Sequence, residues 1–397
     1  MLQSFRTNFN ARFSPARYDH LLKLIHAEYG HSPKFRVAET PVVIPSHLKE
    51  QLISACSSIA DQINTPDFKE KTEGAFIAPN MKIPGENDFS HFLQIDFAIC
   101  KDEQGELSPQ VIEMQGFPSL YFFQELLARS YRSAFDIPSE YSAHLGGISD
   151  TDYLRLLSDL ILDGKKPENV VVLEVEPTKQ TTYIDLLGCQ KQLGTPILCV
   201  TDVIKKDNKL FYKDDKGIEK PIYRIFNRVI FDELDQRSDL TMDFSFQDEL
   251  DVEWVGHPSW FFRISKYTLP LLDHPNVPPS RFLHELEKYP TELDNYVLKP
   301  LFSFAGAGVD LHPTKEKLDA IKDRNNYILQ RKMNYVPIVE TSTDPAKCEI
   351  RMLMLWDKEK KKHRIVNNLV RLSKGEMIGV RYNKDKDWVG GTVGYFE

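Results

Sequence analysis

A nearly all-apolar segment, NVVVLEVEP at residues 169–177, limits the architectures open to this chain. A strand without polar alternation is expected to be buried on both faces, which is typical of a parallel sheet. A helical pattern, YIDLLGCQKQLG, follows and ends at Gly194, and TPILCVTDV is the next predicted strand. Strand, helix and strand in this order predict a small α/β unit, to which we assign residues 150–265.

The segments on either side of this unit show mixed patterns. Residues 1–70 have helical spacing, and FLQIDFAIC and PQVIEMQGFPSL then predict two strands joined by a polar turn. Towards the C-terminus, YVLKP and YILQRKM predict strands, and EIRMLMLWDKEKKKHRIVNNLVRLS predicts a hairpin with a basic turn. Helical spacing also predicts a helix in RFLHELEKY.

Composition excludes several classes of protein. The 397 residues suffice for two or three domains, and 50 Lys and Arg against 58 Asp and Glu give a net charge of −8, which disfavours nucleic-acid binding. No apolar run approaches the roughly 18 residues of a membrane span, and no apolar stretch follows the N-terminal arginines as in a secretory signal. Five cysteines without CxxC spacing indicate free thiols. We therefore expect a cytoplasmic protein without a membrane or nucleic-acid partner.

A lysine at the end of an apolar strand precedes a glycine turn. Lys299 is the next-to-last residue of YVLKP, and SFAGAG, from Ser303 to Gly308, follows. A point charge beside backbone N–H groups that an anion can approach favours phosphate binding. The order differs from a P-loop, in which the lysine follows the glycines. A strand-terminal lysine beside a plain hairpin is the alternative interpretation.

Three oxygen-bearing side chains lie in the two N-terminal strands. Asp96 is in LQIDFAI, and Glu113 and Gln115 are in VIEMQGFPSL. Glu113 and Gln115 are two residues apart and point to one face, where antiparallel pairing would also bring Asp96. Magnesium prefers such ligands and often combines few carboxylates with nucleotide phosphates. Solvated polar residues on a strand face are the alternative.

Four cations lie on or beside apolar strands: Lys266, Arg351, Arg371 and Arg381. Arginines on strand faces can hold a carboxylate or a transferring phosphoryl group through two hydrogen bonds. Ordinary surface ion pairs are the alternative for each of them.

Together these segments resemble the ATP-grasp superfamily of ATP-dependent ligases, in particular glutathione synthetase-like and glutathionylspermidine synthetase-like members. YVLKP with its glycine turn looks like the family's nucleotide strand and phosphate-covering loop, and YILQRKM looks like its hinge strand. EIRMLML resembles the family's ExR strand, and HPSWFFRISKYTLPLL resembles the segment that enters the domain with a second lysine. The resemblance implies that ATP is bound by Lys266, Lys299, Ser303, Ala305, Gly306, Gly308, Gln330 and Lys332.

The resemblance also implies a circular permutation. The family's closing magnesium motif is an Asp on one strand and Glu-x-Asn before a proline turn, and here IDFAI and VIEMQGFPSL resemble it near the N-terminus. Residues 1–145 would then supply helices and the magnesium-binding last strands, residues 150–265 a substrate domain, and residues 266–397 the nucleotide-binding part. The expected fold class is mixed α/β, a circularly permuted ATP-grasp domain with an inserted small α/β domain.

Members of this family activate a substrate carboxylate with the γ-phosphate of ATP and pass the acylphosphate to an amine or thiol. The resemblance implies a magnesium site formed by Asp96, Glu113 and Gln115. It implies catalytic roles at the transferring phosphoryl group for Arg351, Arg371, Arg381 and Asn383.

Two positions depart from the family's pattern. Gln115 stands where the family has Asn, and Gln330 stands where many members have an acidic residue. We predict an ATP-dependent ligase of small-molecule carboxylate and amine substrates; the alternatives are an ATP-grasp small-molecule kinase and an ATP-binding protein without catalysis. The sequence identifies neither substrate, although Lys179, Arg224 and Arg228 are candidates for binding an anionic one, and it does not give the oligomeric state.

Overall fold

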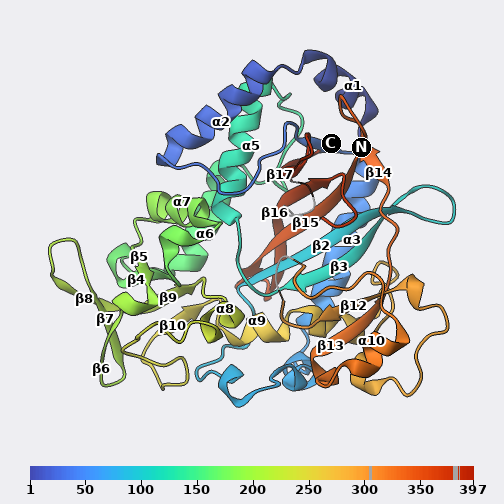
Figure 1. Ribbon diagram of the computed structural model, residues 1–397. Helices are drawn as coiled ribbons and strands as arrows, with labels where there is room; N and C mark the ends of the chain where they lie inside the picture. The colour runs from blue at the N-terminus through green and yellow to red at the C-terminus, as the bar shows by residue number, and fades with distance from the viewer. Residues whose placement is uncertain (304–305, 379–382, 384) are drawn as a thin grey trace.

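A six-stranded antiparallel sheet forms the centre of the computed structural model, which describes residues 1–303, 306–378, 383 and 385–397 (Figure 1). The strand order is β17–β16–β15–β2–β3, and β14 pairs with the first two residues of β15. Because β2 pairs with β15, the sheet joins strands from the two ends of the sequence. The strands are β2 (Phe92–Lys101), β3 (Leu107–Gln115), β14 (Pro337–Val339), β15 (Ala346–Asp357), β16 (Lys362–Ser373) and β17 (Gly390–Thr392).

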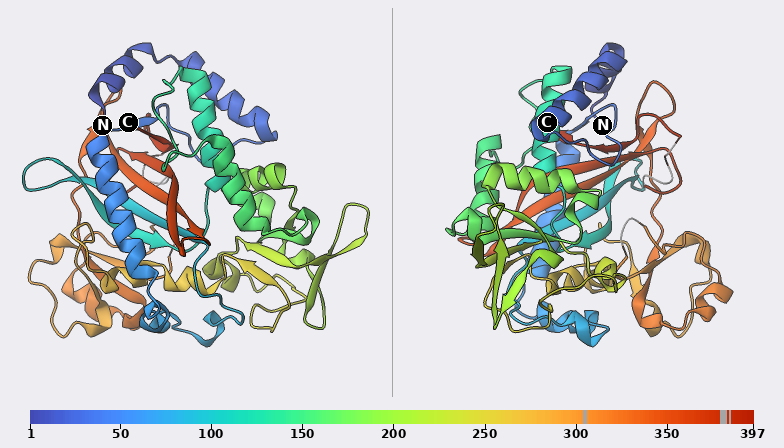
Figure 2. Two further views of the ribbon diagram at one scale, coloured as in Figure 1. Left: turned by 180° about the vertical axis from the view of Figure 1, so that it is seen from behind. Right: turned by 60° about the vertical axis from the view of Figure 1, so that its left-hand side comes forward.

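The two faces of this sheet differ in polarity. Ile95, Phe97, Ile350 and Met352 lie on one face and pack with helix α3 (Ser46–Ile63) in the main hydrophobic core. The view from behind shows α3 lying along this face (Figure 2). Since side chains alternate along a strand, charged and amide side chains occupy the opposite face. The helix therefore leaves the polar face available for a site.

The parallel sheet that the apolar strand predicts is present, with the order β10–β9–β4–β5. Strand β4 (Val170–Glu174) is completely buried and has a neighbour on each side, as its apolar sequence predicts. Helix α7 (Tyr183–Leu193) connects it to β5 (Ile197–Cys199) and ends at Gly194, whose φ is 74°. The other elements are α6 (Asp150–Leu162), β6 (Ile204–Lys206), β7 (Lys209–Lys213), β8 (Glu219–Ile222), β9 (Arg224–Asn227), α8 (Phe231–Asp235) and β10 (Glu253–Val255).

A three-stranded sheet with the order β11–β13–β12 carries the short helix α10 (Lys315–Ala320). Strands β12 (Tyr296–Pro300) and β13 (Tyr327–Arg331) confirm the predictions for YVLKP and YILQRKM. The predicted helix in RFLHELEKY is wrong, because β11 (Ser280–Phe282) pairs antiparallel with β13 and only a 3₁₀ turn follows. Pairing satisfies the backbone and buries Phe282, which outweighs a local helical spacing.

The chain termini lie side by side above the central sheet (Figure 1). The backbone N–H of Leu2 donates to Val43 and that of Glu397 donates to Ile44, so both ends are bound to one strand. In the described part of the chain, no helix combines the length and apolar character needed to cross a membrane. The elements at this end are α1 (Gln3–Arg12), α2 (Pro15–Tyr29), β1 (Val42–Ile44), α5 (Tyr121–Phe135) and β18 (Gly394–Phe396).

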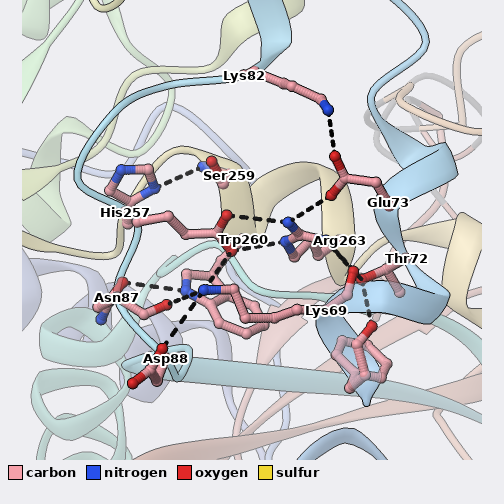
Figure 3. A network of polar contacts seen from close by, with 12 residues as sticks. Lys69, Thr72, Glu73, Lys82, Asn87, Asp88, His257, Ser259, Trp260 and Arg263 are labelled. Carbon is pink, nitrogen blue, oxygen red and sulfur yellow. Dashed lines mark hydrogen bonds and ion pairs between the residues drawn. The ribbon is translucent and has the colours of Figure 1, made fainter. Parts of the chain in front are cut away.

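Arg263 ties the connection between α3 and β2 to helix α9 (Ser259–Arg263) (Figure 3). Its guanidinium is 4% exposed and donates to Glu86 Oε1 at 2.7 Å, to Glu86 Oε2 at 3.1 Å and to Glu73 Oε2 at 3.1 Å. Helix α9 runs directly into the turn that carries Lys266. The network therefore fixes the backbone that positions this lysine.

Candidate active site

A cavity of about 730 Å³ is lined by the polar face of the central sheet, by β12 and by α5. Ala305 and Arg381 lie outside the described residues. Among the other predicted site residues, Asp96, Gln115, Ser303, Gly308, Gln330 and Arg351 do not line this cavity. Those that do are Glu113, Lys266, Lys299, Gly306, Lys332, Arg371 and Asn383.

Strand register brings the predicted acidic and basic residues together. Arg351 on β15 is paired with Asp96 on β2, and Asp96 is paired with Glu113 on β3. Paired positions share one face of a sheet, so these side chains form a row across it. The adjacent row contains Glu349 on β15 and Arg371 on β16.

Asp96 has no exposed surface and is held by two arginines. Arg351 Nε donates to Asp96 Oδ1 at 2.5 Å, and Arg351 Nη2 donates to Oδ2 at 2.6 Å. Arg371 Nη2 donates to the same Oδ2. Both carboxylate oxygens therefore face guanidinium groups, and Arg351 lies beneath the cavity as the partner of Asp96.

Glu113 faces the cavity among several cations. Its Oε2 lies 3.5 Å from Lys266 Nζ, its Oε1 lies 3.7 Å from Arg351 Nη2, and Gln115 Nε2 donates to Oε1 at 3.0 Å. Burial alone would raise the pKa of Glu113, but Lys266, Arg351, Arg371 and Lys299 outweigh it and lower the pKa to about 2. Glu113 is therefore ionised at neutral pH.

A β-bulge provides the partner of Lys299. Asp96 pairs with Glu113, but the next residue, Phe97, pairs with Val111, so Ile112 is an extra residue on β3. Lys299 Nζ donates to the carbonyl of Ile112 at 2.9 Å. Burial lowers the pKa of Lys299 to about 8, although Glu113 opposes this effect. A phosphate beside the ammonium would favour its charged form.

Lys266 contacts the start of the glycine turn. Its Nζ donates to the carbonyl of Ser303 at 2.6 Å. Gly306 and Gly308 have φ values of 72° and 69°, in the left-handed region that favours glycine. A Cβ on Gly308 would lie 3.0 Å from Pro300 Cγ, so the turn folds back closely on the end of β12.

The predicted hinge strand contributes one residue to the cavity. Lys332, just after β13, lines it, whereas Gln330 is fully buried beside it. Neither side-chain polar atom of Gln330 has a hydrogen-bond partner among the described residues. Such an amide is a candidate to bind a ligand, because unpaired buried polar groups are costly.

Asn383 shapes the loop that borders the cavity. Its Oδ1 accepts from the backbone N–H groups of Lys374 and Gly375 at 2.9 and 3.1 Å, and its Nδ2 donates to Ser373 Oγ at 3.0 Å. These bonds connect the end of β16 to Asn383 and place the amide against the cavity wall.

Glu349 is a cavity residue that is not among the predicted site residues. It is 3% exposed, lines the cavity and forms an ion pair with Arg371. Burial raises its pKa to about 7, Asp96 and Glu113 act in the same direction, and Arg371 opposes them. The available signal was its spacing in EIRMLML, because Glu349 stands two residues before Arg351 and so shares its strand face.

A magnesium ion at the predicted site would need nucleotide phosphates to supply most of its ligands. Glu113 faces the cavity, and Gln115 lines a second cavity of about 20 Å³ next to it. Asp96 would have to exchange its arginines for the metal. Within the described residues, no group of three or more His, Cys, Asp or Glu side chains is placed to hold a metal. Magnesium commonly combines one or two carboxylates with phosphates, so Glu113 is the best placed ligand.

The three basic residues considered for an anionic substrate do not line the cavity. Arg224 Nη1 donates to Glu253 Oε2 at 2.5 Å, and Arg228 Nη1 donates to Asp185 Oδ2 at 2.7 Å. Lys179 is an exposed residue of the α/β unit. Both arginines therefore serve the internal packing of the α/β unit.

No protein-family model matches the chain, and no curated protein matches it. Among solved structures, a glutathione synthetase-like effector from Globodera pallida, in its apo form, has the same overall fold, with a TM-score of 0.60 and 13% sequence identity. The match covers 96% of this chain and 96% of the effector chain. The chain thus has a mixed α/β fold similar to that of a glutathione synthetase-like protein, as predicted. Circular permutation, the domain boundaries, the cofactors and the site residues stay predictions.

Proposed function

We propose that the chain is an ATP-dependent ligase that joins a small-molecule carboxylate to an amine or thiol through an acylphosphate. One observation supports this most strongly: Lys266 and Lys299 from the nucleotide segment and Glu113 from the N-terminal hairpin line the same cavity. Among the described lining residues, cations outnumber carboxylates, which favours a polyphosphate ligand. The glutathione synthetase-like fold agrees with this class of reaction.

The proposed reaction consists of two displacements. A carboxylate oxygen of the acid attacks the γ-phosphorus of ATP, the bond from that phosphorus to the β–γ bridging oxygen breaks, and ADP leaves. The amine nitrogen then attacks the acyl carbon, the bond from that carbon to the phosphate oxygen breaks, and inorganic phosphate and a proton leave. Lys266 and Lys299 would neutralise the phosphates, and Arg371 would hold the transferring group. Glu349 would accept the proton, since its pKa of about 7 suits a general base.

Magnesium would be held by Glu113 and Gln115, where it would supply further neutralisation of phosphate charge. Asp96 is a third candidate ligand. Its use requires Arg351 and Arg371 to turn away from it, and both are then available to a phosphoryl group.

Binding of ATP tests the nucleotide assignment. We expect Lys299→Ala to weaken the affinity for ATP with magnesium at least about tenfold, because a charge-assisted contact to phosphate is lost. Lys315→Ala is the matched control, since Lys315 is exposed on α10 in the same part of the chain. Isothermal titration calorimetry measures both variants. Equal affinities of Lys299→Ala and the unchanged chain would contradict the assignment.

Trapping with hydroxylamine separates the ligase from its alternatives. If an acylphosphate forms, hydroxylamine traps it as a hydroxamate and ADP is released. Glu113→Ala should abolish formation of the hydroxamate and release of ADP, and should still fold. A kinase would release ADP with a hydroxyl substrate and form no hydroxamate. A third outcome, in which the chain binds ATP without magnesium and without turnover, would fit an Asp96 that keeps its two arginine partners.

A further inference from the structure

The end of the cavity at α5 differs in chemistry from the end at β12. Its lining side chains are mostly apolar and come from α5, β16 and the segments around β17. We call this part the α5 end and define it by Phe35, Leu120, Gln124, Leu369 and Val389. Figure 1 shows α5 and β12 on opposite sides of the central sheet's open face. Apolar walls of this kind favour an apolar ligand group.

Gln124 is the one amide side chain of the α5 end. It is 1% exposed and lies in the first turn of α5. Its Oε1 is buried without a hydrogen-bond partner among the described residues. A buried acceptor that gains no bond loses its hydration without compensation, so a ligand that brings a donor to it would be favoured.

The charges of the two ends also differ. Lys266, Lys299 and Lys332 gather at the β12 end. Near the α5 end, the charged lining residue in the described chain is Arg36, which forms an ion pair with Glu39 and donates through Nε to the carbonyl of Val389 at 3.1 Å. Among the described residues near the α5 end, no carboxylate lines the cavity and the guanidinium of Arg36 already has partners, so a charged ligand group would be desolvated there with little compensation.

Arg371 stands between the two ends. It pairs with Gly391 of β17 on one side and with Glu349 of β15 on the other, and Leu369 precedes it by two residues on the same strand face. Its side chain is 31% exposed, against 8% for Arg351, so it reaches the cavity. From a carboxylate bound at Arg371, one direction along this strand face leads to Leu369 and the α5 end.

We propose that the α5 end binds the body of the acid substrate, and that this body is apolar and uncharged and carries an amide N–H that donates to Gln124 Oε1. The carboxylate of the acid lies at Arg371, and this part rests on the proposed function. An ammonium donor is excluded because no free carboxylate faces it among the described residues of this end. N-acylated apolar amino acids and the C-terminal residues of apolar peptides have this chemistry.

A pair of acids tests the role of Gln124. N-acetyl-L-leucine and isocaproate share a carboxylate and an isobutyl body, and only the first has an amide. We expect the full chain to bind N-acetyl-L-leucine about tenfold more tightly in calorimetry without nucleotide, because one buried hydrogen bond is gained. In Gln124→Leu this advantage should disappear, whereas the affinity for isocaproate should be retained. N-acetyl-L-glutamate, which adds a charge, should bind about tenfold more weakly than N-acetyl-L-leucine.

Phe35→Ala is the matched variant for the apolar wall. It should weaken both acids by the same factor and leave their ratio unchanged, and it keeps the test open if Gln124→Leu does not fold. The inference is overturned if neither acid binds, or if Gln124→Leu loses affinity for both acids by the same factor. It is also overturned if N-acetyl-L-glutamate binds more tightly than N-acetyl-L-leucine. ATP binding without acid binding would overturn this inference alone. Acid binding that depends on Gln124, without any ATP binding, would overturn only the proposed function.

Discussion

Burial and neighbouring charges together decide the pKa values of the carboxylates in this cavity. Glu113 and Glu349 are carboxylates on adjacent parts of one sheet, yet the pKa of Glu113 falls to about 2 and that of Glu349 rises to about 7. Cations outweigh burial at Glu113. At Glu349 burial dominates, and Asp96 adds repulsion. The cavity thus pairs a permanent carboxylate with one that titrates near neutral pH.

Glu349→Gln should change how stability depends on pH. The side chain ionises near pH 4.5 in the unfolded chain and near 7 in the folded chain. Its contribution to the free energy of unfolding is therefore complete below the lower value and is lost as the pH rises towards the upper one. From about pH 5 to about pH 7, we expect the unchanged chain to lose about 2 kcal/mol relative to Glu349→Gln in urea unfolding.

Glu359→Gln serves as the control for this measurement, because Glu359 is exposed in the turn between β15 and β16. It should follow the pH profile of the unchanged chain. A constant difference between Glu349→Gln and the unchanged chain over this pH range would show that Glu349 does not titrate as described.

At the scale of elements, short irregular segments position the lysines of the site. The bulge at Ile112 turns a backbone carbonyl to Lys299, and the Arg263 network holds α9 in front of Lys266. Neither device has a clear sequence signal, because each depends on a partner from a distant segment. The strand β11 shows the same effect, since its pairing with β13 replaced the predicted helix.

Arg263→Met should destabilise the chain by about 3 kcal/mol, because it leaves the carboxylate of Glu86 without its buried partner. Lys82→Met removes an exposed ion pair with Glu73 and an exposed contact with the ring of Phe76, and should cost less than about 1 kcal/mol. Urea unfolding measures both variants. A loss in Arg263→Met no larger than in Lys82→Met would show that the network of Figure 3 does not hold this connection.

At the scale of the whole molecule, the two ends of the sequence build one sheet. Strands β2 and β3 lie in the same sheet as β15, β16 and β17, and both termini form hydrogen bonds with β1. The division into residues 1–145, 150–265 and 266–397 therefore describes the order along the chain, whereas the central sheet combines the first and last of these parts. Permutation of the strand order is tolerable where termini meet at a surface.

A circularly permuted variant tests whether the proximity of the two termini allows the chain to be opened elsewhere. In this variant the chain starts at Gly147 and ends at Gly146, and a flexible linker of about six residues joins Glu397 to Met1. We expect this variant to fold cooperatively. Both glycines are exposed in a turn between α5 and α6. Its ATP affinity should match that of the unchanged chain. A second variant opened between Leu369 and Val370, inside β16, should fail to unfold cooperatively in urea, and equal behaviour of the two would contradict this account.

The sequence by itself determined the local elements and the types of chemistry. Apolar runs and alternation identified the parallel α/β unit, both hairpins of the central sheet and the strand that carries Lys299, because these depend on periodicity within a few residues. Tertiary structure alone decided that Asp96 faces two arginines, that Glu349 enters the cavity and that Gln124 Oε1 is buried without a hydrogen-bond partner among the described residues. Register, burial and the nearest charges depend on segments far apart in the chain, and local sequence contains no record of those distances.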